Sequence, residues 1–115
     1  MKIGVVSEHT GLSVHAIRYY EKQRLIRPAE KDDSGHRYYS DRDVELLNWI
    51  LCMKNSGMSL TKIRLYAEAF YQQNTQQCLA LLQEHLQNLQ QKQVELNHYL
   101  SVTSHKIEKF KQRLT

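Results

Sequence analysis

The chain is poor in residues that interrupt helices. Its 115 residues include one proline and four glycines, and this scarcity favours a mainly α-helical fold. No apolar run approaches the roughly 20 residues that cross a bilayer. The apolar stretch at the N-terminus is too short for a secretory signal. We therefore expect a cytoplasmic protein without a membrane partner.

Cysteine is scarce as well. Cys52 and Cys78 are too few for a disulfide framework, so we expect two reduced thiols. The sequence also lacks a Gly-rich phosphate loop, a zinc-type Cys/His spacing and an obvious nucleophile constellation. These absences predict that the protein is not an enzyme and that it needs no cofactor and no resident metal.

A formal net charge of +4 mildly favours a polyanionic partner, and the segment Leu12–Glu21 is the best candidate to contact it. Ser13 is a good N-cap for a short helix here. His15, Arg18 and Tyr19 recur at helical spacings on one side, and the opposite side is mostly apolar. This division suits a recognition helix in a DNA major groove, although an ordinary amphipathic helix would share it.

The segments around that helix complete a winged helix-turn-helix pattern. A short helix over 3–9 precedes it across a glycine-containing turn. A two-stranded hairpin, or wing, is predicted after it, with its tip at 32–35. We expect Arg37 to leave the tip where it can pair with a phosphate. Tyr38 and Tyr39 should point to opposite sides of the strand, one inward and one towards the DNA backbone.

Two further helices are predicted. Ser40 caps a helix that ends near Asn55, and Ser59 caps another that ends near Tyr71. Lys54 lies at the end of the first of these, where its ammonium could reach a phosphate. The positions expected to face the core are Val44, Leu46, Leu47, Ile50, Leu51, Met53, Leu60, Ile63, Ala67 and Phe70.

From Thr75 onward, seam positions alternate at spacings of three and four residues. They are Leu79, Leu82, Leu86, Leu89, Gln93, Leu96, Leu100, Thr103, Ile107, Phe110 and Leu114. This heptad pattern predicts a helix of about 54 Å that needs a partner helix. We expect a homodimer in which Gln93 sets the register, and the alternative is a helix folded back over its own N-terminal domain. The pattern leaves open whether the partners run parallel or antiparallel.

Three segments together resemble the MerR family of transcription regulators, namely "IGVVSEHTGLSVHAIRYYEKQRLI", "SGHRYYSDRDVELL" and "CMKNSGMSL". The resemblance implies a mainly α fold, with a winged helix-turn-helix DNA-binding domain over 1–71 and a dimerisation coiled coil over 75–115. It further implies a dimer on a palindromic promoter operator. Such a dimer bends and untwists the DNA, which realigns the promoter elements for RNA polymerase holoenzyme.

The resemblance also implies which residues contact the double-stranded promoter DNA. They are Ser13, His15, Arg18, Tyr19 and Tyr20 of the recognition helix, Arg37 and Tyr38 of the wing, and Lys54. Among them, His15 is expected to read a base edge, because imidazole can donate or accept at a purine. The cations and Tyr19 are expected to hold phosphates. The ring of Tyr20 is instead a candidate to pack beneath the wing.

The signal is a separate question. Cys52 falls away from the apolar stripe, and its "CMKNSG" context resembles the NmlR/AdhR-type branch of the family, which answers electrophilic or nitrosative stress through a single thiol. One alternative is a metal held across the dimer through Cys78, and another is an unknown ligand or none. A coiled-coil adaptor is the rival from another class, but it leaves the polar residues of the recognition helix and wing unexplained.

Overall fold

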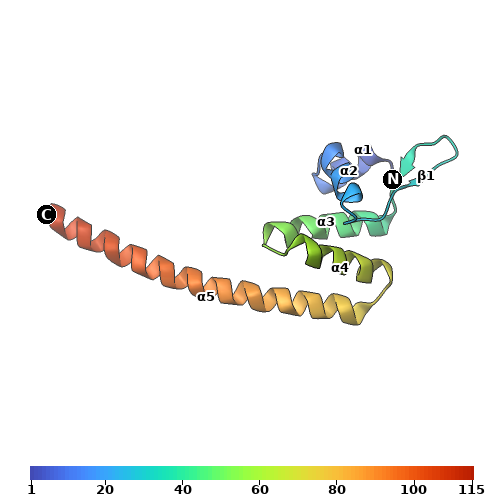
Figure 1. The fold of residues 1–115 in the computed structure, drawn as a ribbon. Coiled ribbons are helices and arrows are strands. Elements are labelled where there is room, and N and C mark those ends of the chain that lie inside the picture. Colours follow the sequence, from blue (N-terminus) through green and yellow to red (C-terminus); the bar gives the residue numbers. More distant parts are fainter. The chain divides into compact units, whose positions relative to one another are not determined.

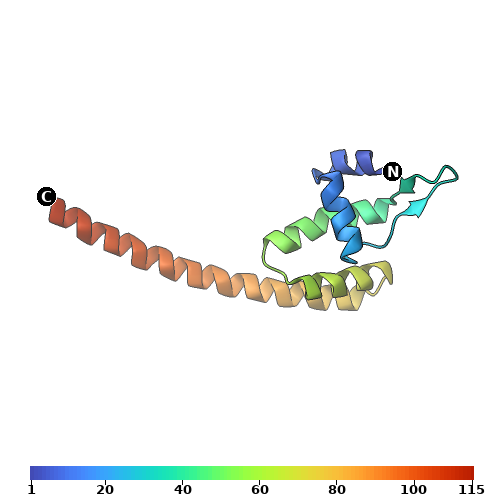
Figure 2. The same cartoon turned by 45° about the horizontal axis from the view of Figure 1, so that its top comes forward.

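The computed structural model describes residues 1–115 as five helices and one hairpin (Figure 1). In chain order these are α1 (Ile3–Thr10), α2 (Val14–Lys22), β1 (Glu30–Lys31), β2 (Arg37–Tyr38), α3 (Asp41–Asn55), α4 (Leu60–Tyr71) and α5 (Thr75–Leu114). The two short strands pair antiparallel, and their hairpin projects beyond the helices that precede and follow it (Figure 2). The predicted fold class, a winged helix-turn-helix followed by one long helix, is confirmed.

The chain divides into two compact units, Met1–Leu81 and Leu82–Thr115. The first two turns of α5 belong to the N-terminal unit. Leu81, in the second of these turns, is 6% exposed and is the buried residue of α5. No helix combines the length and the apolar character that a membrane span requires.

The helices of the N-terminal unit begin where the sequence supplies caps. The hydroxyls of Ser13, Ser40 and Ser59 each accept a hydrogen bond from the backbone N–H three residues on, at 3.0, 3.2 and 3.2 Å. Gly11 and Gly57 follow α1 and α3 with φ of +74° and +97°, which glycine adopts without steric cost. The predicted caps and helix ends are therefore confirmed.

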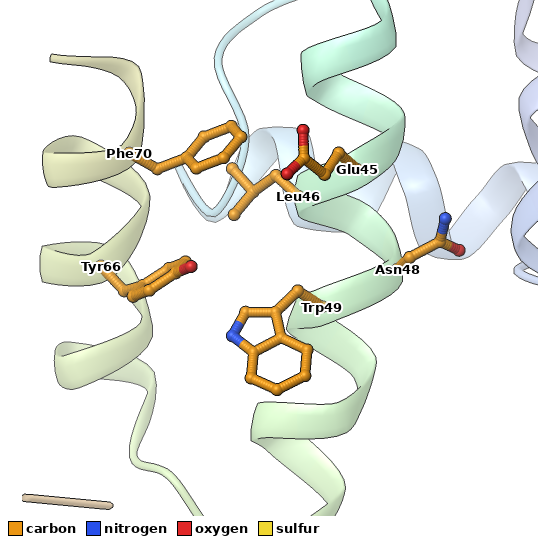
Figure 3. A pocket seen from close by; sticks show the side chains of 6 residues that line it. All are labelled: Glu45, Leu46, Asn48, Trp49, Tyr66 and Phe70. Atoms are coloured by element: carbon orange, nitrogen blue, oxygen red, sulfur yellow. The ribbon is translucent and has the colours of Figure 1, made fainter. Parts of the chain in front are cut away.

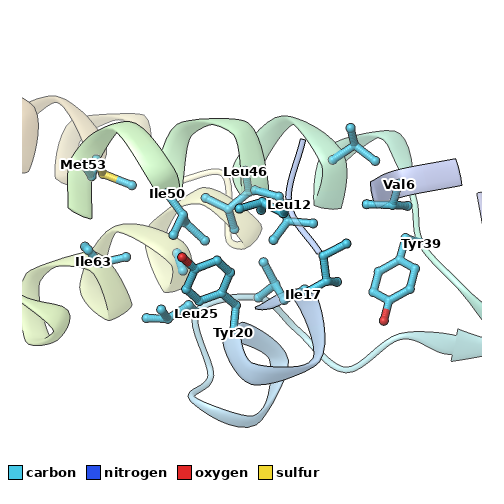
Figure 4. Close-up of a cluster of buried hydrophobic side chains, with 14 of the residues drawn as sticks. Val6, Leu12, Ile17, Tyr20, Leu25, Tyr39, Leu46, Ile50, Met53 and Ile63 are labelled. Atoms are coloured by element: carbon cyan, nitrogen blue, oxygen red, sulfur yellow. The ribbon is translucent and has the colours of Figure 1, made fainter. Parts of the chain in front are cut away.

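The core of the N-terminal unit lies among α1, α2, α3 and α4 (Figure 4). Its largest fully buried side chains are those of Val6, Ile17, Leu25, Ile26, Tyr39, Leu46, Leu47, Ile50, Met53 and Ile63. One predicted core position is wrong, because Leu60 is 38% exposed. Leu60 is the first residue of α4, and the buried face of that helix begins one turn later at Ile63.

A buried carboxylate connects three segments of this unit. Asp43 is 3% exposed. One of its oxygens accepts hydrogen bonds from the Tyr71 hydroxyl at 2.7 Å and from Arg27 Nε at 3.1 Å, and the other accepts from the Ser40 N–H at 2.9 Å. Burial and the bond to Asp43 raise the pKa of Tyr71 well above its usual range. The phenol therefore stays a donor, and the buried charge is fully partnered.

Candidate nucleic-acid interface

The outward face of α2 carries polar and aromatic side chains. His15 and Arg18 are exposed, and Tyr19 is 44% exposed. Ile17, between them in sequence, is fully buried. The hydroxyl of Ser13 is occupied in capping this helix, so Ser13 orients α2. This is the separation of faces that a recognition helix needs, because one side is anchored while the other is free to enter a groove.

The wing is a tight hairpin whose tip is held by one aspartate. Asp32 Oδ1 accepts hydrogen bonds from the N–H groups of Ser34 and His36, both at 2.9 Å. These bonds are the main reason that the pKa of Asp32 lies below its ordinary value. Tyr38 is 53% exposed and Tyr39 is fully buried, so the predicted alternation of these rings is confirmed.

Glu21 connects the end of α2 to the wing. Its carboxylate accepts a hydrogen bond from the Tyr39 hydroxyl at 2.6 Å and another from Arg37 Nη1 at 3.4 Å. Burial, followed by the bond to Glu21, raises the pKa of Tyr39 to about 12. The sequence pattern did not predict this contact. The only signal in the sequence was the position of Glu21 on the inward side of α2, because a carboxylate there needs hydrogen-bond partners.

Tyr20 requires a correction among the predicted DNA contacts. Its side chain is 4% exposed and lies in the core beside Ile17 and Leu25 (Figure 4). The Lys54 ammonium lies over its ring, 5.4 Å from the centroid. Tyr20 follows Ile17 by three residues, so it shares the buried side of the helix. Tyr20 therefore supports the interface from inside, while Lys54 is exposed beside it.

An apolar pocket of about 270 Å³ lies between α3 and α4 (Figure 3). Its lining residues are Glu45, Leu46, Asn48, Trp49, Tyr66 and Phe70. The Trp49 indole from α3 faces the Tyr66 ring from α4 across this space (Figure 3). Tyr66 and Phe70 stack with centroids 6.4 Å apart, so one wall is aromatic.

Cys78 lines a second concavity of about 420 Å³. Arg42 also lines it; its guanidinium lies over the Phe70 ring at 4.5 Å and donates a hydrogen bond to the Phe70 carbonyl at 2.6 Å. Burial raises the pKa of the Cys78 thiol. A thiol whose pKa is raised holds less of the reactive thiolate at neutral pH.

Cys52 has different surroundings. Its side chain is exposed on α3, and it lines neither of these two concavities. An exposed thiol is open to reagents from solvent. Within this single chain, no group of three or more His, Cys, Asp or Glu side chains is arranged to hold a metal ion.

A winged helix-turn-helix with an exposed polar recognition face defines a DNA-binding transcription regulator. The family model described as MerR HTH family regulatory protein matches residues 1–70, and the model described as MerR, DNA binding matches residues 44–101. The chain therefore belongs to the MerR family of helix-turn-helix regulators. It is a transcription regulator and not an enzyme, as its sequence predicts.

Individual relatives agree with this assignment. An HTH-type transcriptional regulator of Haemophilus influenzae is 30% identical over 103 residues, which cover 88% of this chain and 76% of that protein. AdhR of Bacillus subtilis is 37% identical over 70 residues, covering 61% of this chain and 50% of AdhR.

Solved structures show the same fold. A MerR family regulator from Listeria monocytogenes superposes with a TM-score of 0.82 at 25% identity, covering 96% of this chain and 85% of that one. HiNmlR, a MerR family regulator that lacks the sensor domain and is bound to promoter DNA, superposes with a TM-score of 0.77 at 27% identity. That similarity covers 96% of this chain and 90% of HiNmlR.

Proposed function

We propose that this protein is a homodimeric regulator that binds a palindromic promoter operator and switches transcription by distorting the DNA between promoter elements. The observation that carries the proposal is the exposed face of α2, held to the wing through Glu21. The similarity to HiNmlR, whose structure contains promoter DNA, supports it. RNA polymerase holoenzyme is then the partner that reads the distortion on the same promoter.

In this proposal the DNA-binding domain spans 1–71. His15 reads a base edge, while Arg18, Tyr19 and Lys54 hold phosphates. Arg37 and Tyr38 extend the phosphate contacts into the wing. The Arg37 side chain is 43% exposed although it is paired with Glu21, so the guanidinium keeps donors for a phosphate.

The coiled coil over 75–115 joins the two protomers. Seven of its seam side chains are at least half exposed in the single chain, namely Leu79, Leu86, Leu96, Leu100, Ile107, Phe110 and Leu114. Such a row of apolar side chains is costly in water, and a partner helix would cover it. Gln93 and Thr103 are the polar positions of the seam. In the proposed dimer Gln93 would be buried, and it would set the register.

Selection of binding sites from a random duplex pool tests DNA recognition. We expect the wild type to enrich an inverted repeat. His15→Ala should relax preference at one position of each half-site by about 1–3 kcal/mol. Arg37→Ala and Lys54→Ala are the matched controls, because loss of a phosphate contact weakens specific and random sites alike. If His15→Ala weakens binding to specific and random sites equally, this contradicts base reading by His15. If the wild type enriches no inverted repeat, this contradicts the operator proposal.

For the signal we propose modification of the exposed Cys52 thiol by electrophiles or nitrosothiols. Transcription in vitro from the selected operator, with and without formaldehyde or a nitrosothiol, provides the test. We expect the wild type and Cys78→Ser to respond and Cys52→Ser to stay silent, with equal DNA binding by all three. A response that persists in Cys52→Ser and disappears in Cys78→Ser would place the signal at Cys78.

A further inference from the structure

We propose that a basic concavity at the C-terminal end of α2 binds a backbone phosphate of the operator, outside the contacts made by the recognition helix and the wing. Its volume is about 330 Å³, and its lining residues are Lys22, Gln23, Arg24 and Arg64. The inference rests on the proposed function, because it adds a contact to the same duplex. None of these four residues belongs to the expected set of DNA contacts.

The concavity continues the exposed face of α2. Lys22 follows Tyr19 by three residues, Arg18 by four and His15 by seven, so all four lie on one side of the helix. Lys22 is exposed in the last turn. A duplex that contacts His15 and Arg18 therefore has Lys22 on the same side, one turn further along.

The charges that line the concavity are all positive. Three of its four lining residues are cations, and none is acidic. The side chains of Lys22 and Arg24 are exposed and carry no ion pair. The negative end of the α2 dipole accounts for a cation in the last turn of that helix, but it does not account for Arg64 on α4. An anion in the concavity would be attracted by all three cations at once.

Arg64 is held in place for such a contact. Its Nε donates a hydrogen bond to the Gln23 carbonyl at 2.9 Å, and its Nη2 donates to Gln23 Oε1 at 3.2 Å. These bonds fix the plane of the guanidinium and use only some of its five N–H donors. The remaining donors suit a phosphate oxygen, which arginine binds with a planar fork.

Arg24 occupies a position where glycine is expected. It follows the C-cap Gln23 of α2 with φ of +61°, in the left-handed region that side chains rarely adopt. Gly57 occupies the corresponding position after α3 with φ of +97°. Arg24 lines the concavity, so this position places a cation beside Lys22 and Arg64 where a glycine would place none.

Salt dependence of DNA binding measures this contact directly. The logarithm of the binding constant falls with the logarithm of salt concentration by roughly 0.9 for each phosphate contact. The probe is a labelled duplex of the palindrome selected by the wild type, titrated between about 50 and 200 mM salt. We expect Arg24→Gly and Lys22→Gln each to lower the slope by up to roughly 0.9 per protomer.

Gln73→Gly is the matched control. Gln73 follows the C-cap of α4 with φ of +57°, so this change relieves the same backbone strain without removing a cation. We expect Arg24→Gly and Gln73→Gly both to raise the melting temperature, while only Arg24→Gly lowers the salt slope. Weaker DNA binding by a more stable protein cannot be attributed to misfolding.

Unchanged slopes for both Arg24→Gly and Lys22→Gln would overturn the inference and leave the proposed function standing. The inference also fails if Gln73→Gly lowers the slope as much as Arg24→Gly does. It fails as well if the concavity takes only inorganic phosphate, which would leave every DNA slope unchanged. If the wild type binds no duplex in a salt-dependent way, the proposed function fails together with the inference.

Discussion

At the scale of single residues, each of the two pairs of consecutive tyrosines has one exposed ring and one buried ring. Tyr19 and Tyr38 are 44% and 53% exposed, whereas Tyr20 is 4% exposed and Tyr39 is fully buried. The buried phenol of Tyr39 depends on Glu21, which accepts its hydrogen bond at 2.6 Å. This bond ties the end of α2 to the residue that follows β2, the strand that carries Arg37.

The Tyr39 phenol should make stability depend on alkaline pH. Because its pKa is raised from 10.0 to about 12, the folded state keeps a proton that the unfolded chain has lost. The resulting stabilisation is complete below pH 10 and is lost as the pH rises to about 12. We expect the loss of the Tyr39 contribution to lower the free energy of unfolding by about 1 kcal/mol per pH unit in this range, in addition to the contribution of Tyr71, whose pKa is also raised.

Denaturant titrations of Tyr39→Phe and of the wild type at successive pH values test this. The fall in Tyr39→Phe should be shallower, whereas Tyr38→Phe, which removes the exposed phenol of the preceding residue, should follow the wild type. Parallel curves for Tyr39→Phe and the wild type would contradict the assignment.

At the scale of elements, Asp43 holds the start of α3, the end of α4 and the segment before the wing together. It belongs to the capping box of α3 and also accepts hydrogen bonds from Tyr71 and Arg27. Its side chain is 4% exposed, and that of Arg27 is 46% exposed, so the carboxylate is the buried partner of this ion pair. Removing it leaves several donors without an acceptor.

We expect Asp43→Ala to lower the free energy of unfolding by about 3 kcal/mol, because it removes the cap and leaves the Tyr71 hydroxyl unpaired. Asp41→Ala is the matched control, since Asp41 is exposed in the same first turn and should contribute less than about 1 kcal/mol through the helix dipole. Chemical denaturation of both variants makes the comparison. A similar loss of stability in both variants would show that the hydrogen bonds to Asp43 add little to the free energy of unfolding.

At the scale of the whole molecule, the proposed coiled coil can be tested at the apolar seam of α5. Leu96→Lys places a charge at a seam position that is 58% exposed in the single chain. We expect sedimentation to show monomers at concentrations where the wild type is dimeric, together with loss of tight binding to the palindrome.

Val94→Lys is the control for this change, because Val94 is 64% exposed but lies off the seam. It should remain a dimer and bind DNA like the wild type. A dimer that survives Leu96→Lys, or a wild type that sediments as a monomer, would contradict the proposed coiled coil.

The local structure of this protein follows from its sequence alone. The serine caps of α2, α3 and α4, the turn at the wing tip and the length of α5 all depend on residues within one or two turns of each other. Caps, turns and periodicity arise from short-range hydrogen bonds and spacing, so a single segment contains the information. The same holds for the alternation of Tyr38 and Tyr39.

Which polar groups meet depends on how distant segments pack. Glu21 contacts Tyr39 across 18 residues of sequence, and Arg64 contacts Gln23 across 41. Tyr20 was expected either at the DNA or packed beneath the wing, and its ring is buried in the core. Spacing within a helix defines its faces, but tertiary packing determines which face is buried and which charges gather in one concavity.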